Sequence, residues 1–191
     1  LPSYLYLRRW LKALSWLRGS GKRWVLKSPQ HLEQFDPLLT AFPDATIVVT
    51  YRDPVAITAS MATMVAYARR LSTAKPDPKL IGRYWADRSF DLLTSCVAYR
   101  DRLPADRTCD ARLDEFIADA MGVLKRVYRV AGQPLEGLAL SKMAEYSEAN
   151  PRGRHGTVAY DLKALGLDAN VLRERMSAYT QRFGVRDEGL K

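Results

Sequence analysis

The sequence predicts an α/β fold in which a parallel sheet is flanked by helices and the C-terminal half is largely helical. Two short runs that favour strands, residues 24–26 and 47–49, each lead to a cation, a capping residue and a proline, followed by helical spacing. From residue 79 onward helical spacing dominates, and only residues 108–113 have a weak strand pattern. Strand, helix and strand in this order predict a βαβ unit with parallel strands over about residues 23–70.

The junction after the second strand has the features of an anion-binding site. The β-branched run of residues 47–49 predicts a buried strand, and Arg52 stands at its carboxyl end. Asp53 is a capping residue, Pro54 suits the first helical position, and the almost wholly apolar residues 55–68 predict a buried helix. A helix N-terminus has free N–H groups and a partial positive charge, so Arg52 beside it predicts a site for an anion.

The first junction repeats this order of residue types. Lys27 ends the run of residues 24–26, and Ser28 and Pro29 follow as cap and first helical residue. In an open α/β sheet, ligands bind at the edge where the parallel strands end. Lys27 and Arg52 are therefore expected on the same edge, which suits a ligand with more than one anionic group.

Apolar residues at helical spacing place the other helices. A helix after Pro29 is interrupted or restarted at Asp36 and Pro37, because a proline inside a helix removes a backbone hydrogen bond. Ser3 is the expected cap of the first helix, and Asp168 that of the last one. The further helices are predicted over residues 3–18, 79–102, 114–131, 135–148 and 168–183.

A basic loop at residues 150–156 is a second candidate phosphate-binding element. It contains Arg152, Gly153, Arg154 and His155. Glycine allows the backbone to approach a ligand closely, and the arginines would attract phosphate. The alternative interpretation is a flexible surface loop.

Composition narrows the class of protein. The 191 residues suffice for one domain with its own core, and the net charge of +9 suits an anionic ligand, nucleic acid or an acidic membrane surface. A basic solvated surface explains the same charge. Cys96 and Cys109 are the only cysteines and have no metal-ligand spacing, so we expect reduced thiols in a cytoplasmic protein without a metal. No apolar run approaches the roughly 20 residues that span a bilayer.

The order and spacing of several motifs resemble those of one enzyme family. The motifs are Leu-Lys-Ser-Pro-Gln-His-Leu at residues 26–32, Phe-Pro-Asp-Ala at 42–45, Tyr-Arg-Asp-Pro at 51–54 with Ser60, and the segments 160–162, 166–167 and 179–184. They are similar to sulfotransferases that use 3′-phosphoadenosine 5′-phosphosulfate (PAPS), above all to the bacterial branch with many actinobacterial members. The resemblance implies a P-loop-like fold of three layers, with helices on both sides of a parallel sheet, as a single domain over residues 1–191.

The resemblance also implies which residues hold the cofactor. In such enzymes the arginine after the strand and a serine in the following helix hold the 3′-phosphate, which assigns this role to Arg52 and Ser60. A buried hydroxyl needs a partner, and the alternative for Ser60 is a bond to a carbonyl one turn earlier. The basic glycine loop of the family adds phosphate contacts, which correspond to Arg152, Gly153 and Arg154.

Two further residues are candidates for catalysis. Lys27 matches the lysine of the family's Lys-Ser/Thr-Pro motif, where a cation can stabilise charge on sulfuryl oxygens. Its alternative role is that of a lysine in solvent at a strand end. His31 suits a general base near neutral pH, but it lies within the expected helix, where it can also simply pack. His155 fits a loop or cofactor-side position better than that of a base.

The function implied by the resemblance is the transfer of a sulfuryl group from PAPS to a hydroxyl acceptor, with adenosine 3′,5′-bisphosphate as product and no metal. One alternative is a basic nucleic-acid-binding module, although a basic stripe with interleaved aromatics is missing. The other is a nucleotide-dependent kinase. Residues 19–22 fail the P-loop pattern, because Trp16 and Arg23 occupy its required glycine and Ser or Thr positions.

The chain departs from the family at its start. In the family, the first strand–loop–helix binds the 5′-phosphosulfate, and nothing before Trp24 corresponds to this element. In many relatives the catalytic base also lies upstream. We therefore expect a domain that is incomplete at its N-terminus and does not transfer sulfate alone, and PAPS-dependent turnover by this chain would contradict that expectation. An unpaired strand edge would also favour a homo-oligomer.

The acceptor is expected to be a small-molecule alcohol rather than nucleic acid. Met64, Tyr84 and Trp85 would suit an apolar pocket for a lipid, aromatic or glycolipid alcohol. The alternative is that these three side chains belong to the core, as aromatics at helical spacing usually do.

Overall fold

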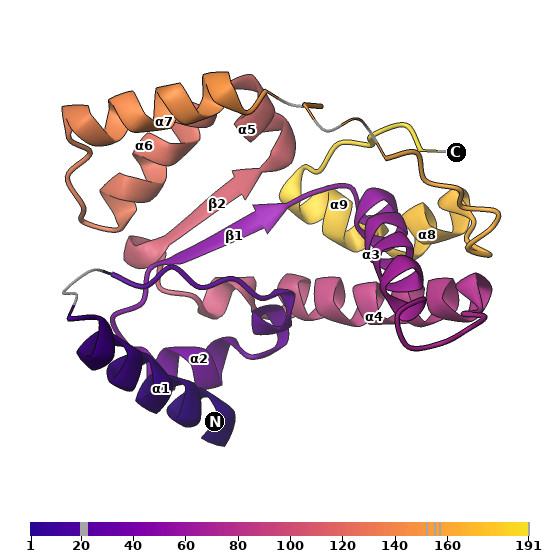
Figure 1. Cartoon of the computed structure of the whole chain (residues 1–191), viewed down its shortest axis with the longest axis horizontal. Helices are drawn as coiled ribbons and strands as arrows, with labels where there is room; N and C mark the ends of the chain where they lie inside the picture. Colours follow the sequence, from indigo (N-terminus) through magenta and orange to yellow (C-terminus); the bar gives the residue numbers. More distant parts are fainter. Residues whose placement is uncertain (20–22, 152, 155, 157, 191) are drawn as a thin grey trace.

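A computed structural model shows an α/β protein that is mostly helical around a small parallel sheet (Figure 1). It describes residues 1–19, 23–151, 153–154, 156 and 158–190. In this part of the chain the sheet consists of β1 (Ile47–Tyr51) and β2 (Thr108–Arg112), paired in register from Ile47 with Thr108 to Tyr51 with Arg112. The predicted α/β fold with a helical C-terminal half is therefore confirmed.

Helices surround the strand pair. They are α1 (Pro2–Arg18), α2 (Phe35–Ala41), α3 (Pro54–Arg69), α4 (Pro78–Tyr99), α5 (Leu113–Ala118), α6 (Ala120–Val130), α7 (Gly137–Ala149), α8 (Ala169–Arg175) and α9 (Ser177–Phe183), with short 3-10 helices at Pro29–Glu33, Arg100–Arg102 and Ala105–Arg107. In Figure 1, α5, α6 and α7 lie on the β2 side and α1 and α2 on the β1 side. Among the residues described, no helix is long and apolar enough to cross a membrane.

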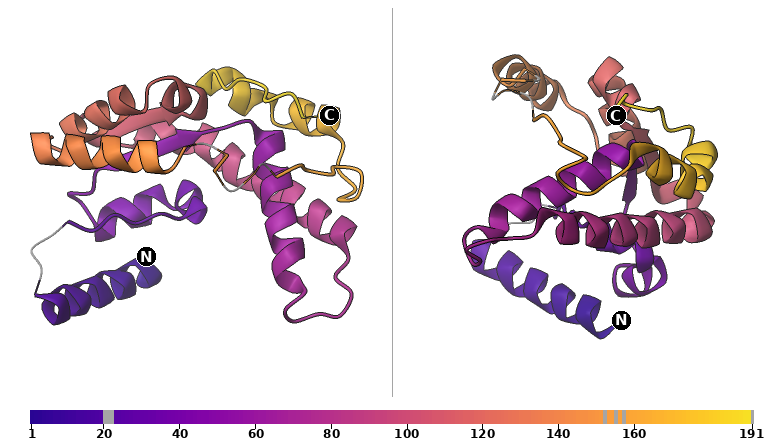
Figure 2. Two further views of the ribbon diagram at one scale, coloured as in Figure 1. Left: turned by 45° about the horizontal axis from the view of Figure 1, so that its top comes forward. Right: turned by 90° about the vertical axis from the view of Figure 1, so that its right-hand side faces the viewer.

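The connection between the two strands explains why they are parallel. After β1 the chain forms α3 and α4, which pack against each other before the chain returns to β2. The first half of α3 is buried, with Val55, Ala59 and Ala62 inaccessible to solvent, whereas Met64 and Tyr67 in its second half are exposed. The prediction of a helix buried along its whole length is thus wrong for that second half. Figure 2 shows the end of α3 and the start of α4 projecting beyond the sheet.

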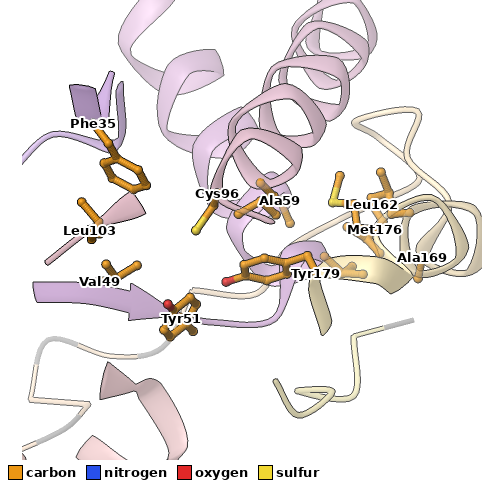
Figure 3. Close-up of a cluster of buried hydrophobic side chains, with 13 residues drawn as sticks. Phe35, Val49, Tyr51, Ala59, Cys96, Leu103, Leu162, Ala169, Met176 and Tyr179 are labelled. Carbon is orange, nitrogen blue, oxygen red and sulfur yellow. The ribbon is translucent and has the colours of Figure 1, made fainter. Parts of the chain in front are cut away.

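The core lies where β1 ends and combines side chains from distant parts of the chain (Figure 3). The ring of Tyr51 stacks on Phe183 with 4.4 Å between ring centroids, and Tyr179 lies 6.2 Å from Tyr51 by the same measure. Cys96 from α4 and Met176, which separates α8 from α9, belong to the same buried cluster. The C-terminal helices therefore pack against the strand end that leads into Arg52.

The predicted first strand is not formed. Residues 24–27 have no strand partner, Val25 is 92% exposed, and Leu26 and Lys27 are also exposed. A strand is stable only when its backbone N–H and C=O groups are paired with a neighbour, and β1 pairs with β2 alone in the described residues. The βαβ unit expected over residues 23–70 is therefore wrong, and β1, α3, α4 and β2 form the parallel crossover instead.

Two of the predicted helical segments before α7 are divided. The segment after Pro29 is interrupted as predicted, but the break between its 3-10 helix and α2 lies at Gln34, and Asp36 lies inside α2 instead of capping it. The helix expected over residues 114–131 is split into α5 and α6 at Asp119, whose carboxylate accepts a hydrogen bond from the Gly122 N–H at 2.8 Å. The bond satisfies a free N–H at the start of α6, so the break is a new helix N-terminus.

The first and last helices differ from the prediction in smaller ways. Leu1 rather than Ser3 precedes α1, and Pro2 is its first residue. Asp168 caps the C-terminal helical region as predicted, accepting from the Asn170 N–H at 2.8 Å. The helix expected over residues 168–183 is divided at Met176 into α8 and α9.

Candidate functional site

Arg52 follows the last residue of β1 and is held there by α9. Its N–H donates to the Tyr179 hydroxyl, and that hydroxyl donates to the Arg52 carbonyl, both at 3.3 Å. Burial raises the pKa of Tyr179 well above its usual value, so the phenol stays protonated and can donate. The backbone at the strand end is thus fixed by a residue near the C-terminus.

The helix that begins beside Arg52 has the predicted cap. The buried Asp53 carboxylate accepts a hydrogen bond from the Val55 N–H at 2.8 Å, and Pro54 is the first residue of α3. The other carboxylate oxygen of Asp53 accepts from the Glu188 N–H at 2.9 Å. The predicted strand end, cation, cap and proline are therefore all present at this junction.

The Arg52 guanidinium is engaged by a carboxylate. Its Nε and Nη2 lie 2.7 and 2.8 Å from the two carboxylate oxygens of Glu188, which is a bidentate ion pair. Hydrogen bonding to Glu188 is the main reason why the pKa of Arg52 is raised. This planar pair of donors fits a carboxylate or a phosphate equally well. In this structure the Arg52 guanidinium thus binds the carboxylate of Glu188.

Ser60 lies on α3 about two turns beyond Asp53 and is partly buried. The bond to a carbonyl one turn earlier, which was the alternative for Ser60, is made instead by Thr58, whose hydroxyl donates to the Pro54 carbonyl at 2.8 Å. In the described part of the chain the Ser60 hydroxyl forms no hydrogen bond. Its side chain therefore keeps its hydrogen-bonding capacity for a ligand.

Two more arginines, which were not predicted as site residues, lie near this strand edge. The pairing of Tyr51 with Arg112 puts Arg112 at the end of β2, where it contacts Glu115 at 2.6 Å. Arg173 on α8 pairs with Asp187 at 2.8 Å. Arg112 had a sequence pattern that could have revealed it, since it too ends a strand and precedes a helix. Arg173 and Glu188 have no such local pattern.

The basic loop is only partly described. Arg152 and His155 lie outside the described residues. The Arg154 guanidinium donates to the Ala149 carbonyl at 2.5 Å and to the Asn150 side-chain oxygen at 3.0 Å. Gly153 has a φ of +83°, which suits glycine. In this structure Arg154 therefore binds the C-terminal end of α7, where a cation is favourable.

The two candidate catalytic residues lie in the segment that precedes β1. Lys27 is exposed on a stretch that is neither helix nor strand, so it does not end a strand, which corrects the predicted placement. His31 is partly buried, and its Nδ1 lies 2.7 Å from the Tyr4 hydroxyl of α1. Burial lowers the pKa of His31, so its imidazole is neutral at pH 7. No hydrogen bond joins either residue to Arg52 or Ser60 in the described structure.

Two of the three side chains considered for the acceptor pocket are exposed. Met64 is 56% exposed and Tyr84 is 61% exposed. Tyr84 packs edge-on against Trp85, with 5.7 Å between the ring centroids. The core alternative is therefore wrong for Met64 and Tyr84. Separately, the described residues hold no group of three or more His, Cys, Asp or Glu side chains that could bind a metal.

Comparisons with known proteins agree with this architecture. A model of the sulfotransferase family matches residues 4–137, and none of the curated proteins matches the chain. The solved structure of sulfotransferase STF9 from Mycobacterium avium is 27% identical with a TM-score of 0.85, covering 98% of this chain and 48% of that one. Sulfotransferase STF1 from Mycobacterium tuberculosis H37Rv is 29% identical with a TM-score of 0.68, covering 82% and 40%.

This chain thus spans about half the length of the Mycobacterium avium protein and less of the other. The structural likeness nevertheless extends over almost the whole of the chain described here, and the P-loop-like α/β fold is common to all three. The family model alone accounts for well over half of the residues. The chain therefore belongs to the sulfotransferase family.

Proposed function

We propose that this chain provides the 3′-phosphate-binding half of a PAPS-dependent sulfotransferase site, which transfers a sulfuryl group to a hydroxyl acceptor. The strongest support is the bidentate ion pair between Arg52 and the Glu188 carboxylate. Arg52 stands at the carboxyl end of β1, beside the N-terminus of α3. Membership of the sulfotransferase family supports the same chemistry.

The residues at this junction fit the 3′-phosphate of PAPS. Arg52 donates two hydrogen bonds to a carboxylate, whose acceptor geometry is similar to that of a phosphate, and the Ser60 hydroxyl lies about two turns into α3. Both would hold the 3′-phosphate. Gly153 and Arg152 of the basic loop are the candidates for further contacts, and Arg154 would first have to leave the end of α7.

PAPS supplies the sulfuryl group, which forms a new S–O bond to the acceptor oxygen as the S–O bond to the 5′-phosphate breaks. The proton of the acceptor hydroxyl must pass to a base. His31 is the candidate base within this chain, because burial lowers its pKa and keeps the imidazole neutral at pH 7. In this role the Nδ1–H donates to the Tyr4 oxygen, which leaves Nε2 unprotonated. Lys27, as an exposed cation, is the candidate for stabilising charge on the sulfuryl oxygens.

The acceptor that we propose is an apolar alcohol of the lipid, aromatic or glycolipid kind. Met64 and Tyr67 in the second half of α3 and Tyr84 on α4 are exposed. An apolar group that packs on these side chains removes apolar surface from water, and this burial favours binding.

Nucleotide-dependent protection against heat tests the proposed site. Adenosine 3′,5′-bisphosphate should raise the melting temperature of the chain more than adenosine 2′,5′-bisphosphate, which has the same charge, because only the former presents a phosphate to Arg52 and Ser60. Equal stabilisation by both at several salt concentrations would contradict the proposal and favour non-specific binding of anions, as in a nucleic-acid-binding module.

Replacing Ser60 tests its assigned contact separately. Ser60→Ala should weaken adenosine 3′,5′-bisphosphate binding about tenfold, since a hydrogen bond to a charged group is lost. Ser95→Ala, in a partly buried position on α4, is the matched control and should leave affinity unchanged. Calorimetric titration measures both, and equal affinity of the two variants would remove Ser60 from the site.

A further inference from the structure

The segment Val185–Leu190, here called the acidic tail, folds back from α9 onto the end of β1. α9 ends at Phe183 and is followed by Gly184 with a φ of +61°. The Val185 N–H donates to the Thr180 carbonyl at 3.0 Å, and the chain reverses here. Both ends of the tail, Val185 and Leu190, pack against the hydrophobic core. In Figure 1 the tail runs back along α8 and α9 toward the C-terminus.

Two consecutive carboxylates of the acidic tail hold two arginines of the candidate site. Asp187 pairs with Arg173 at 2.8 Å, and Glu188 pairs with Arg52 through both of its oxygens. The Glu188 N–H also donates to Asp53, the residue that caps α3. The tail thus engages both the Arg52 guanidinium and the residue that caps α3.

We propose that the acidic tail is a plug in which Glu188 occupies the place on Arg52 that a phosphate takes, so that the tail must be displaced before a nucleotide phosphate binds. The inference rests on the proposed function for the identity of the ligand. Carboxylate and phosphate compete for the same two N–H donors of the guanidinium. A phosphate dianion beside a retained Glu188 carboxylate would also meet like-charge repulsion.

The contacts of the acidic tail are of the kind that a ligand can break. The Arg52 and Glu188 side chains are 34% and 28% exposed, and partly exposed ion pairs stabilise only weakly. A solvent-open pocket of about 140 Å³ is lined by Asp53, Arg173 and Asp187, among others. The Nε of Arg173 is buried and has no hydrogen-bond partner in the described residues. The tail therefore borders an open pocket and leaves one donor of Arg173 unused.

A different role for Glu188 predicts the opposite result. If Glu188 only oriented Arg52 while phosphate bound the remaining N–H groups, removing its charge would weaken ligand binding. If Glu188 is a plug, removing its charge strengthens binding, because a larger fraction of molecules then has Arg52 accessible. The sign of the change in affinity therefore distinguishes a competitor from a positioning residue.

The test compares Glu188→Gln, the double variant Asp187→Asn/Glu188→Gln and the control Glu145→Gln in the full chain. Glu145 is exposed on α7, and its replacement changes the net charge by the same amount as Glu188→Gln. Calorimetry with adenosine 3′,5′-bisphosphate should show about threefold tighter binding for Glu188→Gln, about tenfold for the double variant, and no change for Glu145→Gln. Unchanged melting temperatures would show that all variants are folded.

A second readout needs no nucleotide. The rate at which phenylglyoxal modifies Arg52, followed by mass spectrometry, should rise several-fold in the double variant and not in Glu145→Gln.

Inorganic pyrophosphate, titrated in parallel, is a phosphate probe without the nucleoside. Weaker bisphosphate binding by Glu188→Gln or an unchanged modification rate would overturn the plug. A failure of every variant to bind either the bisphosphate or pyrophosphate would overturn it as well. Tighter binding of inorganic pyrophosphate and bisphosphate alike would keep the plug and contradict the nucleotide site. If the wild type binds the bisphosphate more tightly than pyrophosphate and no tail variant changes the bisphosphate affinity, the nucleotide site is kept and the plug is overturned.

Discussion

Gly82→Ala should lower the free energy of unfolding by about 3 kcal/mol. Gly82 is buried in α4, and a Cβ atom there would lie 2.0 Å from the carbonyl oxygen and 3.0 Å from the carbonyl carbon of Leu165. Both neighbours are backbone atoms, so relief requires moving α4 away from the loop that precedes α8. The gain in helix propensity from alanine, about 1 kcal/mol, offsets only part of that loss.

Gly137→Ala is the control for this prediction. Gly137 is the first residue of α7, and nothing lies within 4 Å of a Cβ placed there. This variant should stay within about 0.5 kcal/mol of the wild type. Urea denaturation measures both, and a Gly82→Ala chain as stable as the wild type would show that α4 and Leu165 do not approach this closely.

Asp110→Ala should cost about 2 kcal/mol of stability. The Asp110 carboxylate accepts a hydrogen bond from the buried Tyr51 hydroxyl at 2.6 Å and a bidentate pair from Arg100 at 2.9 and 2.7 Å. It thereby joins β1, β2 and the end of α4. Removal leaves the Tyr51 hydroxyl and a guanidinium that is only 15% exposed without their partner. Asp110 itself is 48% exposed, so we expect less than the loss of a fully buried network.

The effect of Asp110 should depend on pH. Burial acts to raise its pKa, but the hydrogen bonds from Arg100 and Tyr51 outweigh burial and hold the pKa below its usual value. A carboxyl with a depressed folded pKa stabilises fully above the unfolded pKa of about 4, and this contribution is lost as pH falls through the folded pKa. The difference between wild type and Asp110→Ala should therefore shrink in acid.

The control is Asp106→Ala. Asp106 is 78% exposed and pairs with Arg107 at 3.8 Å, so its replacement should change stability by less than about 0.5 kcal/mol at any pH. Denaturant titrations at pH 7 and at pH 3 compare the two variants. Equal losses for Asp106→Ala and Asp110→Ala at pH 7 would contradict a structural role for the network.

Local patterns predicted the junction at Arg52 correctly because every part of it is a neighbour in sequence. The β-branched run, Arg52, the Asp53 cap and Pro54 follow one another, and each acts through the adjacent backbone. Residues 24–26 have a similar pattern and yet form no strand, because a strand also needs a paired neighbour that the pattern does not reveal.

The partner of Arg52 could not be predicted from the sequence. Glu188 lies 136 residues further along the chain, and only the packing of α9 on Tyr51 and the reversal at Gly184 bring it to β1. The predicted boundaries of one helix were wrong for a different, local reason. Asp119 competes locally for backbone N–H groups within a stretch whose apolar spacing is otherwise continuous, and the cap prevails.

Calorimetric titration of the chain with adenosine 3′,5′-bisphosphate and with 5′-AMP, at one fixed salt concentration, tests the central claim most directly. The wild type should bind the bisphosphate at least about tenfold more tightly, and Arg52→Ala should bind both nucleotides alike, because the charged contact to the 3′-phosphate is lost. Arg83→Ala, which removes an exposed cation from α4, should retain the preference. A preference for the bisphosphate that persists in Arg52→Ala, or equal binding of both nucleotides by the wild type, would contradict the assignment of Arg52 to the 3′-phosphate.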